Sequence, residues 1–257
     1  GEDRPGGRET MTKGRPTSRW RGPAGLTAAI LLVCLFQFLL SCGDGGEPAG
    51  RAAPGTGPES FTFFEIGRNS SFSESIRREM SGRLGNDAIE RRSIVDLEIN
   101  YKGFLRDHLP ELDALNRQLN HPPGERVEHD VVRLMYRYAR SRNSPFDYVE
   151  LVFDGQSRRP LVFRMRFKVD EAGTVESLRT KYGPPDAVRW KGETGESLLW
   201  RKERDVLAVS LVPDQFGNPI YHITLHFTEN LESLIASAQA LKERTSREKT
   251  QSKKPAF

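Results

Sequence analysis

Three consecutive residues, Glu128-His129-Asp130, carry the side chains that acid–base catalysis uses most often. A histidine base needs a carboxylate that meets its ring in space and orients it. We expect these residues on a helix, where consecutive positions point about 100° apart and would not face one another. Acids in a first helical turn also stabilise the helix dipole, so a structural role is favoured. His121 and His108 complete the group of candidate bases.

A second histidine pair, His222 and His226, has the spacing of a zinc site on a helix. The surrounding sequence instead predicts a strand, because apolar residues alternate with Thr224 and the two histidines. Residues four apart on a strand are about 13 Å from each other, too far to share one ion. We therefore interpret both histidines as part of a solvated face, and we expect no metal and no cofactor. No nucleophile elbow, phosphate loop, dinucleotide fingerprint or cysteine cluster is found, which disfavours the enzyme classes that carry a local signature.

Two further groups of side chains could bind a partner. Arg133, Arg137 and Arg140 form one stripe of a helix predicted over 127–142, and such a stripe could contact the phosphates of lipopolysaccharide or anionic lipid. The wet face of an amphipathic helix has the same composition, and this interpretation is favoured. Trp190 and Trp200 could line a groove, although packing in a core is the commoner role of tryptophan.

The most specific signal lies near the amino terminus. Leu26 to Leu40 is an uncharged run of fifteen residues behind a basic flank, shorter than the roughly 20 apolar residues of a spanning helix. This layout is typical of a secretory signal, with Met11 expected as its start. The end of the run, Leu39-Leu40-Ser41-Cys42, resembles the lipobox of bacterial lipoproteins. The resemblance implies cleavage before Cys42 and acylation there. Because Gly43 follows, it also implies an outer-membrane location, with the protein facing the periplasm.

Composition limits the partners of the expected mature chain. The formal net charge of +4 is misleading, because residues 42–240 hold 27 lysines and arginines against 30 acids, a balance of −3. A basic face for nucleic acid is therefore not supported. The mature chain keeps one cysteine, Cys42, so no intramolecular disulfide can form and stability must come from a hydrophobic core.

Periodicity divides the remainder into a tether, a folded domain and a tail. Residues 42–60 have the Gly/Pro/Ala composition of a flexible tether, and residues 244–257 that of a basic disordered tail. Between them we expect an α+β domain over 61–243, with two subdomains, 61–145 and 146–243, as an alternative. Apolar spacing predicts helices over 72–84, 110–119, 127–142, 174–182 and 229–243. Alternation predicts strands over 61–66, 93–101, 146–153, 161–169, 197–201, 206–212 and 220–228.

The segments 75–92 and 177–190 share a weak internal similarity: a helix, a glycine, Asp-Ala and an aliphatic residue ahead of a strand. Gly183 is expected to cap its helix with a positive φ. From Leu178 through Tyr182-Gly183-Pro184-Pro185-Asp186 to Trp200, this part of the chain resembles the helix–turn–three-strand unit of BamE-like small envelope lipoproteins, over roughly residues 174–228. That resemblance implies a role in the cell envelope.

These observations predict a mostly antiparallel sheet with helices packed on one side, tethered to the membrane through Cys42. The favoured function is non-catalytic binding of an envelope protein or glycan. Binding is expected at an exposed edge formed by the strands 161–169 or 220–228, or at a groove beside Trp190 and Trp200. The alternative is a periplasmic hydrolase that uses Glu128 and His129.

Overall fold

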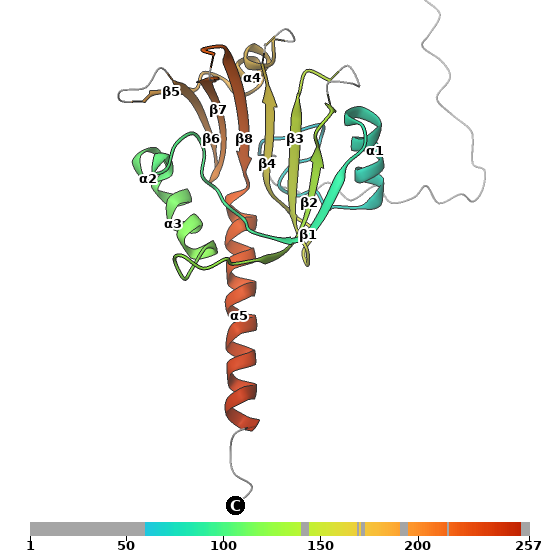
Figure 1. Ribbon diagram of the computed structural model, residues 1–257, viewed down its shortest axis with the longest axis vertical. Helices are drawn as coiled ribbons and strands as arrows, with labels where there is room; N and C mark the ends of the chain where they lie inside the picture. The colour runs from blue at the N-terminus through green and yellow to red at the C-terminus, as the bar shows by residue number, and fades with distance from the viewer. Residues whose placement is uncertain are drawn as a thin grey trace, which may run out of the picture. The chain divides into compact units, whose positions relative to one another are not determined.

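The α+β class is confirmed by the computed structural model, which describes residues 60–139, 144–168, 170, 173–190, 195–214 and 216–252 (Figure 1). The helices are α1 (Glu74–Leu84), α2 (Phe104–His108), α3 (Pro110–Leu119), α4 (Thr174–Tyr182) and α5 (Thr228–Ser252). The strands are β1 (Ala88–Ser93), β2 (His129–Tyr136), β3 (Tyr148–Asp154), β4 (Pro160–Phe167), β5 (Asp186–Arg189), β6 (Glu196–Lys202), β7 (Asp205–Pro213) and β8 (Pro219–His226).

All eight strands form one antiparallel sheet in the order β1-β2-β3-β4-β8-β7-β6-β5. β2 and β3 flank the expected subdomain boundary at residue 145, and they are hydrogen-bonded neighbours in this sheet. The expectation that β4 or β8 forms an edge is wrong, since these two strands pair with each other at the centre. The edges are the short strands β1 and β5, which alternation alone did not predict because their residues are mostly exposed and polar.

The two halves of the sheet repeat the same unit. Each begins with a helix (α1 or α4), passes through a short edge strand, and continues as three antiparallel strands toward the centre. Gly85 and Gly183 end the two helices with nearly identical dihedrals, φ 89°, ψ −164° and φ 83°, ψ −171°. The positive φ predicted for Gly183 is therefore confirmed. The weak sequence similarity thus coincides with a structural repeat, and only the first half contains an insertion, residues 94–128, between its first two strands.

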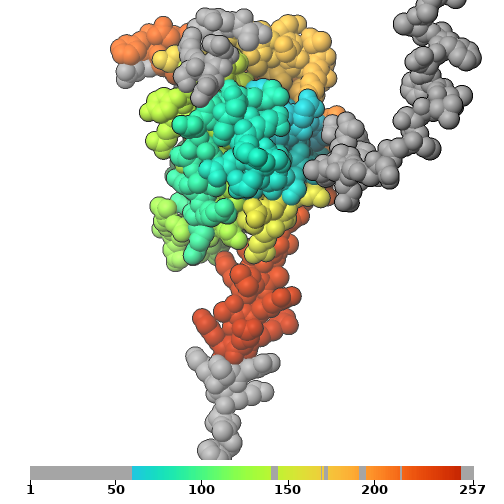
Figure 2. Space-filling model, turned by 90° about the vertical axis from the view of Figure 1, so that its right-hand side faces the viewer, coloured from blue at the N-terminus to red at the C-terminus, as the bar shows by residue number. Residues whose placement is uncertain are grey.

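The last helix extends well beyond the sheet. Its first part is anchored by Leu231, Leu234 and Ile235, whereas the side chains from Gln239 to Lys249 are exposed (Figure 2). α5 continues to Ser252, so residues 244–252 are helical and not the disordered segment that composition suggested. In the part of the chain that the structure describes, no helix combines the length and apolarity needed to cross a membrane.

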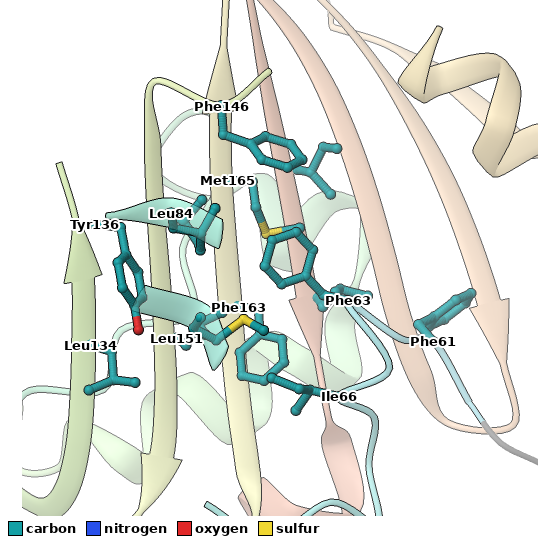
Figure 3. Close-up of a cluster of buried hydrophobic side chains, with 14 of the residues drawn as sticks. Phe61, Phe63, Ile66, Leu84, Leu134, Tyr136, Phe146, Leu151, Phe163 and Met165 are labelled. Carbon is teal, nitrogen blue, oxygen red and sulfur yellow. The ribbon is translucent and has the colours of Figure 1, made fainter. Parts of the chain in front are cut away.

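Hydrophobic clusters cover both faces of the sheet. The cluster on one face packs the turn after Ser60, α1 and α4 against alternate residues of the strands, such as Leu134, Leu151 and Phe163 (Figure 3). The cluster on the opposite face packs residues 95–101, α2, α3 and α5 against the intervening residues. The helices, which we expected on one side, are therefore divided between both faces. Among the described residues, every member of both clusters lies after Ser60.

The predicted helix over 127–142 is wrong, because this segment contains strand β2. Val131, Leu134 and Met135 have helical spacing, but Val132 and Tyr136 are buried as well. Because both faces of the sheet are covered at β2, apolar side chains occupy both sides of the strand and period-2 alternation is lost. A strand that is buried on both faces is easily mistaken for a helix.

Residues 94–101 form an extended strap over the sheet, and the strand predicted there is also wrong. Alternation correctly predicts burial of Val95 and Leu97 beneath the strap. Its backbone, however, bonds to side chains instead of a neighbouring strand. The carbonyls of residues 94 to 97 accept, in order, from Arg133, Asn120, Arg164 and His226. The strand predicted over 61–66 is likewise a tight turn closed by one bridge between Phe63 and Ile66.

Candidate functional site

A pocket of about 520 Å³ opens between α3 and the middle of α5, with the start of β2 at its base. Its volume lies within the range of small-ligand sites. The pocket is lined by Ala114, Arg117, Gln118, Leu119, His121, Val127, His129, Ile235, Ala238, Gln239 and Lys242. In Figure 1 α3 lies beside the upper part of α5, although more than a hundred residues separate the two helices in sequence.

Local sequence explains why these side chains face the pocket. Pro110 begins α3, and Leu112, Leu115 and Leu119 turn one side of the helix toward the core. Ala114, Arg117 and Gln118 follow the i, i+3, i+4 spacing of a second face, which is left for the pocket. On α5, Leu231, Leu234 and Ile235 fix the first turns, so that Ala238, Gln239 and Lys242 lie opposite α3.

The lining combines cationic and apolar groups. Arg117 and Lys242 carry positive charge, His121 and His129 are ionisable, and no aspartate or glutamate lines the pocket. Arg117 pairs with Asp113 one turn earlier at 3.0 Å, and its side chain remains 72% accessible. Ligands that suit this surface carry an anionic group beside an apolar one.

His129 is the candidate base that lies in a cleft. Its side chain is 8% exposed, and its Nε2 lies 2.9 Å from the carbonyl oxygen of Leu119. Because a carbonyl only accepts, Nε2 is the donor in this hydrogen bond. The backbone, and not a carboxylate, therefore orients the imidazole.

Three other members of the predicted constellation lie away from His129, and one shares its pocket. Glu128 and Asp130 are its neighbours at the start of an extended strand, so their side chains point to the opposite side. Glu128 pairs with Arg126 at 2.8 Å. His108 lies on α2, where its ring packs 4.7 Å from Phe104 and its Nε2 is 3.4 Å from the hydroxyl of Tyr101. His121 lines the same pocket as His129.

The predicted strand at His222 and His226 is confirmed as β8, but the solvated interpretation of His226 is wrong. His222 is exposed, whereas His226 is completely buried because the strap covers it. Its Nε2 lies 3.2 Å from the Leu97 carbonyl, and its Nδ1 has no hydrogen-bond partner. Burial, together with the charge of Arg164, lowers the pKa of His226 to about 3. No group of three or more potential metal ligands is found among the described residues.

The expected partner-binding side chains are dispersed. Arg133 lies on β2, where it donates to Ile94 of the strap and pairs with Glu90 at 3.4 Å; Arg137 follows the strand and is exposed. Arg140 lies outside the described residues. Because the segment is not a helix, these arginines form no helical stripe.

The two tryptophans are buried in opposite clusters. The Nε1 of Trp190 donates to Ser197, and that of Trp200 donates to the carbonyl of Gly183 at 2.8 Å. They line no common groove. Neither edge of the sheet favours pairing with a partner strand. β5 has only four residues, and β1 carries the charged residues Glu90, Arg91 and Arg92.

Sequence reasoning did not identify Arg117, Gln118, Gln239 and Lys242 as site residues. The signal that could have found them is the second polar face of two helices whose first face is already committed to the core. No protein-family model matches this chain, and comparisons with curated proteins and with solved structures find no significant match.

Proposed function

We propose that this chain is a non-catalytic lipoprotein of the bacterial envelope, held in the outer membrane by acylated Cys42. It faces the periplasm and binds a segment of a partner protein in the pocket between α3 and α5. The observation that carries the proposal is the lining of this pocket, where Arg117 and Lys242 flank the apolar groups of Leu119, Val127 and Ile235. A segment with acidic and apolar side chains complements that lining.

The competing function is a hydrolase that uses Glu128 and His129. One observation favours it, since His129 lines the pocket and is hydrogen-bonded through Nε2 to the Leu119 carbonyl. The charge that would orient the ring is missing, because Glu128 pairs with Arg126 on the other side of the strand. Replacing the ring separates the two functions. If His129→Gln removes a hydrolytic activity while the protein stays folded and keeps its partner, the hydrolase is the correct function.

A photo-reactive residue placed at Gln118 tests the pocket in native membranes. We expect a crosslink to one acidic protein segment, lost in the double variant Arg117→Glu, Lys242→Glu and in Ala238→Trp, which fills the pocket. The matched control is Arg179→Glu on α4, an exposed arginine outside the pocket. Crosslinking that survives both pocket variants would refute the proposed site.

The anchor has a separate test. Cys42→Ala should abolish acylation and cleavage together, and mass spectrometry of the membrane-extracted protein should find the mature amino terminus acylated on the wild-type cysteine. An unmodified wild-type terminus would contradict the lipoprotein assignment, but it would not bear on the proposed binding pocket.

A further inference from the structure

Two of the most exposed large side chains lie at the same end of the sheet. Tyr138 is 79% exposed and Phe216 is 78% exposed. Tyr138 lies two residues after the end of β2, and Phe216 lies in the turn between β7 and β8. In the register of the sheet these connections leave the same end, opposite to the end from which α5 departs (Figure 1).

The turn that carries Phe216 is fixed by its own hydrogen bonds. The carboxylate of Asp214 accepts from the backbone N–H groups of Phe216 and Asn218, both at 2.8 Å, and from the Asn218 side chain at 3.2 Å. The backbone closes the same turn, because Gly217 donates to Asp214 and Asp214 donates to Asn218. Gly217 provides the positive φ of 82° that this geometry needs. These hydrogen bonds therefore hold the backbone from which Phe216 is exposed to solvent.

Exposed cations surround the two aromatic side chains. Arg137 precedes Tyr138, and Arg166 and Lys168 lie at the end of β4 between the two connections. Two acids at this end, Asp170 and Asp214, accept hydrogen bonds from backbone N–H groups. Asp170 caps the first turn of α4 through both oxygens. Hydrogen bonds from Asn218 and Phe216 lower the pKa of Asp214, and the charge of Lys168 acts in the same direction.

We propose that this end of the sheet docks on the surface of an anionic bilayer, with Tyr138 and Phe216 at the interface and the cations against lipid phosphates. The spacing of the aromatic side chains favours a bilayer over a protein partner. In the sheet order β3, β4 and β8 separate β2 from β7, which places the two connections roughly 19 Å apart. A protein interface is built around a contiguous desolvated core. A bilayer accepts separate aromatic anchors among basic residues.

This inference does not depend on acylation of Cys42 or on the α3–α5 pocket. It is tested with the chain from Gly43 onward, which lacks the apolar run and retains every residue of the two clusters that the structure describes. Phe216→Trp places a reporter in the proposed surface. Leu241→Trp places the control on the exposed part of α5, where the native side chain is 60% accessible. The probe is a vesicle of brominated phosphatidylglycerol and phosphatidylcholine.

We expect bromine to quench the indole introduced at position 216 and not the one at position 241, with vesicles of phosphatidylcholine alone giving little quenching. Arg137→Glu with Lys168→Glu should weaken vesicle binding at least about tenfold, since each basic residue near an anionic surface contributes measurably. Arg244→Glu with Arg247→Glu, an equal charge change on α5, should leave it unchanged. Equal quenching at both positions, binding without quenching at position 216, or insensitivity to the first charge pair would each overturn the proposal.

Discussion

Burial of an uncharged His226 should make the protein markedly less stable in mild acid, where the unfolded chain takes up a proton on this ring and the folded protein does not. The ring is fully buried beneath the strap, faces the charge of Arg164, and has a pKa of about 3 in the folded state. In the unfolded chain a histidine titrates near 6.5. The folded-state pKa is the lower one, so the stability due to neutral His226 is present above pH 6.5 and is lost as the pH falls from 6.5 toward 3.

The expected magnitude follows from these two pKa values. At pH 5 the unfolded ring is mostly protonated and the folded ring is not, which lowers the free energy of unfolding by about 2 kcal/mol relative to pH 7. The assay is urea unfolding of wild type and His226→Gln at both pH values. Glutamine does not titrate, and its amide can still donate toward Leu97. We expect the variant to lose about 2 kcal/mol less than wild type between pH 7 and pH 5.

A matched substitution controls for the loss of any histidine. His222→Gln changes the same strand at a position where burial and the charge of Arg166 lower the pKa of the ring less than at His226, so it should alter the pH dependence in the same direction but by a smaller amount. Other groups that titrate in this range are common to all three proteins and cancel in the comparison. Identical pH dependence in wild type and His226→Gln would refute the claim that the strap buries a neutral ring.

Two further variants test the repeated unit. Gly183→Ala should cost about 1 kcal/mol in urea unfolding, because Gly183 has φ 83° and an added Cβ would meet nothing within 4 Å, leaving the backbone as the sole source of strain. Its control, Gly82→Ala inside α1, should instead stabilise by about 0.5–1 kcal/mol, and equal effects would contradict the assigned dihedrals. Trp200→Phe should cost about 1 kcal/mol or more, since the hydrogen bond to the Gly183 carbonyl is lost; no change in unfolding midpoint would argue against that bond.

Local patterns predicted elements best where one face of a segment meets water. α1 and α3 each have a buried side and an exposed side, and α1 and α4 each end at a glycine. The bounds of these three helices follow closely from the sequence. The failures occur where that asymmetry is absent. β2 is buried on both faces, and β1 and β5 are exposed on nearly every residue. The strap is a third case. Its side chains alternate between buried and exposed, but its backbone carbonyls accept hydrogen bonds from side chains and not from a neighbouring strand. Alternation in sequence therefore indicates which side chains are buried, and not whether the segment belongs to a sheet.

Strand order could not be read from local patterns, and this limited the predictions about sites. β4 and β8 are long and alternating, which suits an edge with one wet face. They are central because each ends one copy of the repeat, and the copies meet there. The pocket was missed for a similar reason. The inward faces of α3 and α5 were predicted correctly, but their contact joins segments that are distant in sequence.

The parts of the chain that lie outside the repeat build almost the whole pocket. α3 belongs to the insertion between β1 and β2, and α5 follows the last strand of the second copy; neither has a counterpart in the other half. Of the lining residues, His129 alone comes from a strand of the repeated sheet. A sheet with apolar residues on both faces needs cover on both, and α1 and α4 supply it on one face only. The additions complete that cover on the second face, and in doing so they create a cationic and apolar cleft that the repeated unit does not contain. Substitutions that separate binding from folding should therefore be found on the faces of α3 and α5 that line the pocket, while the repeat itself should tolerate few changes without loss of stability.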